Sequence, residues 1–184
     1  ILRIPNGELV VGTTDGLHFI DIDKQHVTLL QRAENDPHSI SHNFIWDLFL
    51  DSQQNLWVAT RNGINRITLP NKEIKRFHEG ERMETRNLPH EIRTVNEDNE
   101  GNIWFGSMDG VHRLTPASGQ LIYFRHDPQD DKSIGAKPAW AIHVDKLGEI
   151  WVGTDHGGLN RYDKAHNNFT RYKHDSANPG SISS

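Results

Sequence analysis

A repeat of 47 residues constrains this chain more than any other feature. A short apolar phrase that ends in Gly or Ala and then Thr or Ser occurs four times, at residues 9–13, 56–60, 103–107 and 150–154. The second residue of each copy falls at position 10, 57, 104 or 151, so consecutive copies lie 47 residues apart. A fixed period of this length is typical of solenoids, propellers and other repeat arrays.

Each period reads as four short strands. In the second copy, residues 44–50, 56–60, 64–69 and 74–78 are apolar or alternating runs separated by turn residues. No segment shows the apolar stripe of a helix over about ten or more residues. Four strands in a period of about 40 to 50 residues are typical of one propeller blade. The predicted fold is therefore an all-β β-propeller with about four blades of four antiparallel strands.

The turn between the second and third strands predicts a register. If residues 61–62 form a two-residue turn, Trp57 lies opposite Arg66. The same count gives two further pairs, Trp104 with Arg113 and, after one extra turn residue, Trp151 with Arg161. The first copy has Val10 and Phe19 at these positions, so both members of the pair change together. We interpret these Trp and Arg residues as structural, part of blade packing rather than ligand contacts.

The last copy carries a family resemblance. Residues 151–163 read WVGTDHGGLNRYD and are followed by Phe169, Tyr172, His174-Asp175 and the sequence NPGSI at 178–182. This pattern resembles the two-component regulator propeller repeat, and the resemblance covers nearly the whole chain. It implies the extracytoplasmic sensor region of a bacterial hybrid two-component histidine kinase or diguanylate cyclase. A periplasmic location and an output domain outside this region follow from the resemblance alone.

Composition excludes several classes of function. The chain has 184 residues, 24% of them charged and 34% hydrophobic, with no apolar run long enough to span a membrane. A formal net charge of −5 without a basic tract argues against nucleic acid or an anionic membrane as partner. The absence of cysteine excludes disulfides and thiolate chemistry. No cofactor is indicated.

The period also predicts the extent of each blade. The expected blades are residues 1–31, 43–79, 90–126 and 138–173, within a single propeller segment, and residues 174–184 lead towards a further inner strand. The first residue is Ile rather than Met and no signal peptide is visible, so we expect a fragment. Unpaired sheet edges favour association, so the expected partners are the remaining blades of a longer chain or second copies.

The candidate ligand-binding residues lie at one end of the predicted strands. In a four-stranded blade, the loop that leads into the inner strand and the turn between strands two and three share one face, around the axis, where propellers bind ligands. Trp, Arg, Asn, His and Asp side chains there would suit a carbohydrate or another small ligand. The candidates, which we call the rim residues, are Asn43, Trp46, Arg61, Asn62, His90, Arg93, Asp109, Lys137, Trp140, Asp155 and His156.

Two alternatives to a sensor stay open from the residues. A propeller enzyme, a lyase or glycosidase, would need two carboxylates that face one cleft, for which Asp15, Asp109 and Asp155 qualify, or a general base such as His90 or His156. A structural array that dimerises a receptor would need no small ligand.

The sequence does not predict a metal site. No histidines show a compact zinc-ligand spacing. The Asp-led turns at 51–55, 98–102 and 145–149 are interpreted as hairpin turns rather than calcium loops. His18 and His112 share one strand position with Asn65 and Asn160, which predicts a polar, hydrogen-bonding site there.

Overall fold

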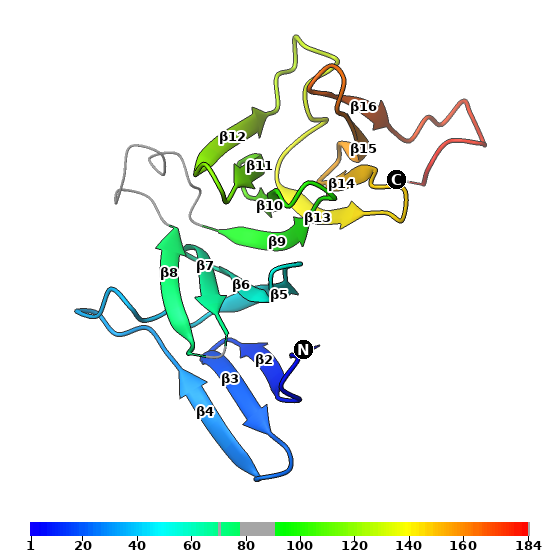
Figure 1. The fold of residues 1–184 in the computed structure, drawn as a ribbon. Helices are drawn as coiled ribbons and strands as arrows, with labels where there is room; N and C mark the ends of the chain where they lie inside the picture. The colour runs from blue at the N-terminus through cyan, green and yellow to red at the C-terminus, as the bar shows by residue number, and fades with distance from the viewer. Residues whose placement is uncertain (70, 78–90, 184) are drawn as a thin grey trace. The chain divides into compact units, whose positions relative to one another are not determined.

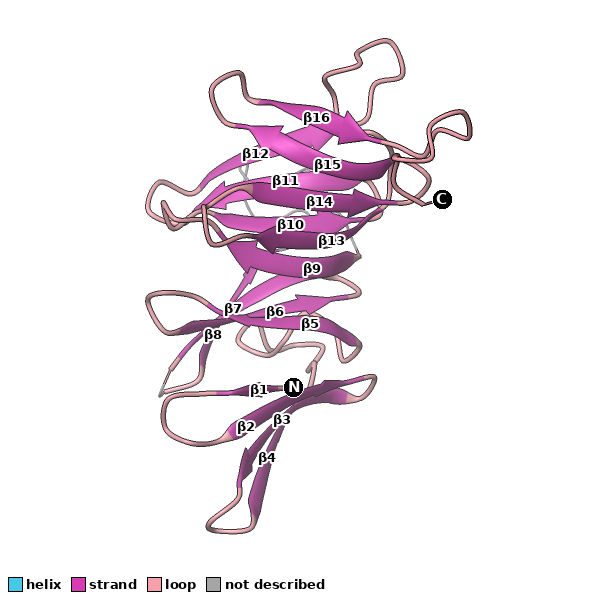
Figure 2. Cartoon of the chain, turned by 90° about the vertical axis from the view of Figure 1, so that its right-hand side faces the viewer, coloured by secondary structure: helices cyan, strands magenta, loops and turns pink. Residues whose placement is uncertain are grey.

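The structure is a computed structural model, and it describes residues 1–69, 71–77 and 91–183. The described chain forms two compact units, residues 1–95 and 96–184, and the division falls within one strand. Each unit is built from the predicted strands. No described segment is helical, and Figure 2 shows strands joined only by loops and turns.

The first unit holds two four-stranded sheets, in blue to green in Figure 1. The first sheet has the strands β1 (Leu2–Arg3), β2 (Leu9–Thr13), β3 (Gly16–Asp21) and β4 (His26–Leu30) in sequence order. The second has β5 (Ile45–Leu50), β6 (Asn55–Thr60), β7 (Gly63–Thr68) and β8 (Glu73–Phe77) in the same order. The four strands predicted for the second copy are confirmed to within one residue over the described positions; His78 lies outside them.

The third sheet contains β9 (Ile92–Glu97), β10 (Ile103–Ser107), β11 (Gly110–Thr115) and β12 (Gln120–Arg125). The fourth contains β13 (Ala139–Val144), β14 (Ile150–Thr154), β15 (Gly158–Asp163) and β16 (Asn168–Tyr172). Both sheets keep sequence order from strand to strand, as the labels of Figure 1 show. Four sheets of this kind match the all-β blade architecture expected from the repeat.

The predicted register is confirmed in every copy. Trp57 pairs with Arg66, and Val10 pairs with Phe19. The other two copies agree, with Trp104 opposite Arg113 and Trp151 opposite Arg161. In the third sheet, the guanidinium carbon of Arg113 lies 5.5 Å from the centroid of the Trp104 ring.

Each Trp of this pair is held by an Asp that the sequence analysis assigned only to a turn. The indole Nε1–H of Trp57 donates to Asp51 Oδ2 at 2.8 Å. The equivalent bonds are 2.7 Å from Trp104 to Asp98 and 3.0 Å from Trp151 to Asp145. The other carboxylate oxygen of each Asp accepts backbone N–H groups of its own turn. The hairpin interpretation is therefore confirmed, and one carboxylate ties the turn to the strand behind it.

At the position shared by Asn and His, the two Asn residues meet the loop that leads into their blade. Asn65 Oδ1 accepts the backbone N–H of Ser41 at 2.9 Å, and Asn160 Oδ1 accepts that of Gly135 at 2.8 Å. Arg76 and Arg171, directly opposite these Asn residues, donate to carbonyls of the same loops. In the two Asn copies the predicted polar site is thus a clamp that fastens the incoming loop to its own blade. In the two His copies, His18 Nδ1 and His112 Nδ1 are buried without a hydrogen-bond partner among the described residues.

Apolar packing forms a separate core in each unit. In the first unit the core includes the fully buried Val10, Leu17, Phe19 and Val58. In the second it includes Trp104, Val111, Val152 and Phe169, each at most 1% exposed. The small residue of the repeated phrase permits close packing, because a Cβ at Gly12 would lie 2.5 Å from Ile45 Cγ2.

Candidate functional site

Two rim tryptophans owe their positions to β-bulges. In the pairing of β5 with β6, Ile45 faces Thr60 and Asp47 faces Ala59, which leaves Trp46 as the extra residue. The same irregularity between Ala139 and Ala141 leaves Trp140 as the extra residue of β13. A bulge re-aims a side chain and occurs often beside binding sites. Trp46 is 38% exposed and Trp140 is 46% exposed.

In the first unit, Trp46 is the centre of a polar and aromatic cluster. The guanidinium carbon of Arg93 lies 3.7 Å from the centroid of the Trp46 ring, and the Phe44 ring centroid lies 4.5 Å from it. Glu91 accepts a 2.9 Å hydrogen bond from Arg93 and lies 3.3 Å from Arg61 Nε. The carboxylate of Glu91 therefore joins two rim arginines beside an exposed indole. We call Trp46, Arg61, Glu91 and Arg93 the indole cluster.

The surroundings of the indole cluster are electropositive. His42 Nδ1 accepts the backbone N–H of Phe44 at 2.8 Å, which places any ring proton on Nε2. Burial, together with the charges of Arg61 and Arg32, lowers the pKa of His42. A neutral imidazole and two guanidinium groups leave this end of the strands rich in hydrogen-bond donors.

Two other rim residues of this unit form hydrogen bonds within loops and turns. Asn43 Oδ1 accepts the backbone N–H of Arg32 at 2.7 Å, and the N–H of Asn62 donates to Thr60 Oγ1 at 3.0 Å.

Next to the bulge, Asp47 accepts N–H bonds from Leu48 and Val95, and burial raises the pKa of its carboxyl group. His90 lies outside the described residues.

In the second unit the rim residues are more exposed. Lys137 Nζ lies 3.8 Å from Asp109 Oδ1, and the two side chains are 59% and 57% exposed. Asp155 and His156 are neighbours in the turn between β14 and β15, with 3.7 Å between Asp155 Oδ1 and His156 Nε2. The side chains of these four residues are each at least 46% exposed, and Trp140 is also exposed.

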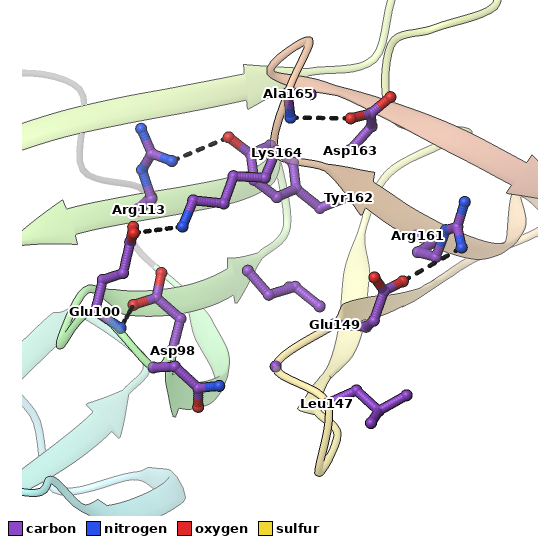
Figure 3. Close-up of a pocket in the computed structure, with 13 residues that line it drawn as sticks. Asp98, Glu100, Arg113, Leu147, Glu149, Arg161, Tyr162, Asp163, Lys164 and Ala165 are labelled. Atoms are coloured by element: carbon purple, nitrogen blue, oxygen red, sulfur yellow. Dashed lines mark hydrogen bonds and ion pairs between the residues drawn. The ribbon is translucent and has the colours of Figure 1, made fainter.

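A hollow that the sequence analysis did not identify lies at the opposite ends of the strands of the second unit. It has a volume of about 460 Å³ and is formed by the turn of β9 to β10, the turn of β13 to β14 and the end of β15 (Figure 3). We call it the turn groove. Its lining includes three cations and four carboxylates: Arg113, Arg161, Lys164, Asp98, Glu100, Glu149 and Asp163.

The turn groove is crossed by two contacts between neighbouring sheets. Lys164 of the fourth sheet forms an ion pair with Glu100 of the third, and Arg113 of the third donates to Tyr162 Oη of the fourth at 3.0 Å (Figure 3). The available signal in the sequence was a turn position that differs from copy to copy and holds Gln53, Glu100 or Leu147. Variation of this kind is common at exposed turns, so the sequence alone does not identify the turn groove.

Neither candidate region has the geometry of a metal centre. Within residues 1–69, 71–77 and 91–183, no three His, Asp or Glu side chains are grouped so that they could hold a metal ion. In the same ranges there is no helix long and apolar enough to cross a membrane.

Comparison with known proteins identifies a repeat in the chain. A family model described as the two component regulator propeller matches residues 39–62, a segment that contains Trp46, Arg61 and Asn62. Among curated proteins, no significant match was found.

Solved structures share the blade architecture. The extracellular domain assigned to the hybrid two component system BT3049 of B. thetaiotaomicron has a TM-score of 0.75 and 22% identity, covering 89% of this chain and 21% of that one. The extracellular domain assigned to BT4673 of the same organism has a TM-score of 0.73 and 21% identity, covering 95% and 22%. Virginiamycin B lyase of Staphylococcus aureus has a TM-score of 0.66 and 18% identity, covering 96% and 55%.

These likenesses show the fold. The chain spans about a fifth of the length of the first two structures. The propeller blade architecture predicted from the repeat is therefore confirmed.

Proposed function

Because the chain carries a two component regulator propeller repeat at residues 39–62, we propose that it is a non-catalytic, ligand-sensing module of a bacterial signal-transduction receptor. Two of the similar structures are extracellular domains of such systems, which supports this assignment and a periplasmic location. In this proposal the kinase or cyclase output lies in another domain. The chain contributes recognition and passes on a conformational change.

We infer that the ligand is a saccharide, because of the residues that form the indole cluster. Trp46 is an exposed aromatic ring on a bulge, backed by Arg93 on its ring and by the Glu91 carboxylate that joins Arg93 to Arg61. Sugar rings stack on aromatic faces, and their hydroxyl groups accept from guanidinium groups and donate to carboxylates. A rigid ring with fixed polar neighbours supplies both kinds of contact without reordering.

The enzymatic alternative has less support. Of the carboxylates that a glycosidase could use, Asp109 lies beside Lys137 and Asp155 lies beside His156. A hydrolase needs two carboxyl groups that face one bond of the substrate. The likeness to a lyase is one of fold, at 18% identity. In the proposal, the partners other than the saccharide are further blades of the parent chain or a second copy.

Isothermal titration with a panel of neutral and acidic oligosaccharides tests the proposal. We expect at least one saccharide to bind, and Trp46→Ala to weaken that binding by about tenfold, the loss of one stacking contact. Tyr172→Ala is the matched control, because Tyr172 is an aromatic residue of the same 38% exposure on the outer strand β16. No binding by any saccharide, or equal losses in both variants, would contradict the proposal.

A further inference from the structure

We propose that the turn groove is a second binding site, specific for a sugar acid whose carboxylate pairs with Arg113. The inference does not depend on the proposed function, since the turn groove lies at the opposite strand ends from the rim residues of the second unit. It rests on the pattern of satisfied and unsatisfied charges in the groove.

Arg113 is the cation of the groove that lacks a carboxylate partner among the described residues. One of its amino groups donates to Tyr162 Oη at 3.0 Å, and its guanidinium carbon lies 5.5 to 6.0 Å from the ring centroids of Trp104, Phe124 and Tyr162. The aromatic rings fix the guanidinium plane and leave its other N–H groups available. A guanidinium held in this way matches the two oxygens of a carboxylate.

The other two cations of the groove are neutralised. Arg161 Nη1 lies 3.3 Å from Glu149 Oε2, and Lys164 is paired with Glu100 (Figure 3). The seven charged residues of the lining carry four negative and three positive charges, so the groove is not positive as a whole, and Arg113 is the cation that these pairs leave over. An anionic group of a ligand would be drawn there rather than to either pair.

Each carboxylate of the groove already has a hydrogen-bond or ion-pair partner, which makes it a poorer partner than Arg113 for a charged group of a ligand. Asp98 accepts from the indole of Trp104 and from two backbone N–H groups. Asp163 pairs with His166 at 2.8 Å, a hydrogen bond that lowers the pKa of its carboxyl group. With Glu100 and Glu149 already paired, an amino acid would find a partner for its carboxylate but none for its ammonium group.

The two ion pairs on the walls suit hydroxyl groups. Glu100 with Lys164 and Glu149 with Arg161 each place an acceptor next to donors, and a sugar hydroxyl both donates and accepts. Tyr162 is only 7% exposed, so its ring offers little surface for stacking. Leu147, 86% exposed at the rim of the groove, supplies an apolar contact for ring C–H groups. One monosaccharide fits within about 460 Å³.

Titrations of the 184-residue chain with D-glucuronate, D-glucose and acetate, followed by NMR, test this site. Glucuronate differs from glucose only in the carboxylate that replaces the C6 hydroxymethyl group, and acetate carries the carboxylate alone. We expect glucuronate to bind at least about tenfold more tightly than either control compound, from one bidentate charged contact plus the hydroxyl contacts.

Variants assign the binding to Arg113. Arg113→Gln should weaken glucuronate binding about tenfold or more, and Arg113→Lys should weaken it less, because a lysine keeps the charge but loses the planar fork. Arg66→Gln is the matched control, since Arg66 has the same strand position opposite a Trp and does not line the groove.

Three results would overturn the proposal. The first is equal affinity for glucose, acetate and glucuronate, and the second is no glucuronate binding by the folded, unsubstituted 184-residue chain at millimolar concentrations. The third is glucuronate binding that survives in both Arg113 variants while these remain folded by circular dichroism.

Discussion

The first and second sheets keep the same register with opposite chemistry at three matching positions. The second sheet uses Asp51, Trp57 and Arg66, joined by an indole hydrogen bond and a cross-strand pair. One period earlier, the first sheet has Ile4, Val10 and Phe19. All three of these are at most 3% exposed and belong to the apolar core of that unit.

We call Asp51, Trp57 and Arg66 the polar set. The comparison with the first sheet shows that the backbone of the blade does not require them. The turn of the first sheet makes the same bond from the N–H of residue 4 to the carbonyl of residue 8 that Asp51 makes to Asn55, at 3.0 Å and 2.9 Å. Asn6 Oδ1 there accepts the N–H of Glu8. Within the polar set, Asp51 and Trp57 satisfy each other, whereas Arg66 Nε is buried without a hydrogen-bond partner among the described residues. Replacing one member leaves its partner unsatisfied, whereas replacing the whole set does not.

The largest expected loss of stability comes from a substitution among the three apolar residues of the first sheet, Ile4, Val10 and Phe19. Phe19→Ala removes a fully buried ring and should lower the free energy of unfolding by about 4 kcal/mol. Urea unfolding followed by Trp fluorescence measures the change. A loss below about 1 kcal/mol would mean that the three apolar residues do not hold the first sheet.

A substitution in the polar set should lower the free energy of unfolding somewhat less. Asp51→Ala leaves the buried indole N–H of Trp57 and two turn N–H groups without their acceptor, at a cost of about 3 kcal/mol. Lys24→Ala, which removes an exposed ion pair with Asp21, is the control and should leave the urea midpoint unchanged. If Asp51→Ala behaves like Lys24→Ala, the indole bond does not stabilise the blade.

A pH titration extends the comparison to the third sheet, where His112 replaces the clamp Asn. Burial, with the charge of Arg125, lowers the pKa of His112 to about 3, so the folded chain holds this imidazole neutral while the unfolded chain protonates it below 6.5. Its contribution is complete above pH 6.5 and is lost as the pH falls, by up to about 1.4 kcal/mol per unit. His112→Asn should remove that slope between pH 6.5 and 4.5, read from urea midpoints. If the dependence of the urea midpoint on pH is unchanged in this variant, His112 is not the group responsible for it.

The sequence predicted the features that one copy of the repeat shares with another. The period, the four strands and the pairing of Trp57 with Arg66 follow from spacing, because a two-residue turn determines which residues face each other. The bulges at Trp46 and Trp140 could not be predicted in this way, since an extra residue on one strand is visible only against its partner.

The turn groove was missed for a different reason. Arg113 was interpreted as blade packing because of its predicted position opposite Trp104, a position that the register has. Its availability to a ligand depends on Tyr162 and Lys164 of the neighbouring sheet, and no count along the chain brings those residues together. Features made by one blade are encoded locally, and features made between blades are not.

Hydrogen–deuterium exchange with and without the tightest-binding oligosaccharide of the panel tests most directly whether recognition occurs at the indole cluster. We expect slower exchange for backbone amides of residues 42–47, 61–62 and 91–93, and no change in the turn at 51–55 at the other end of the same strands. Protection confined to the turn at 51–55 or to the outer strands β4 and β8 would contradict it.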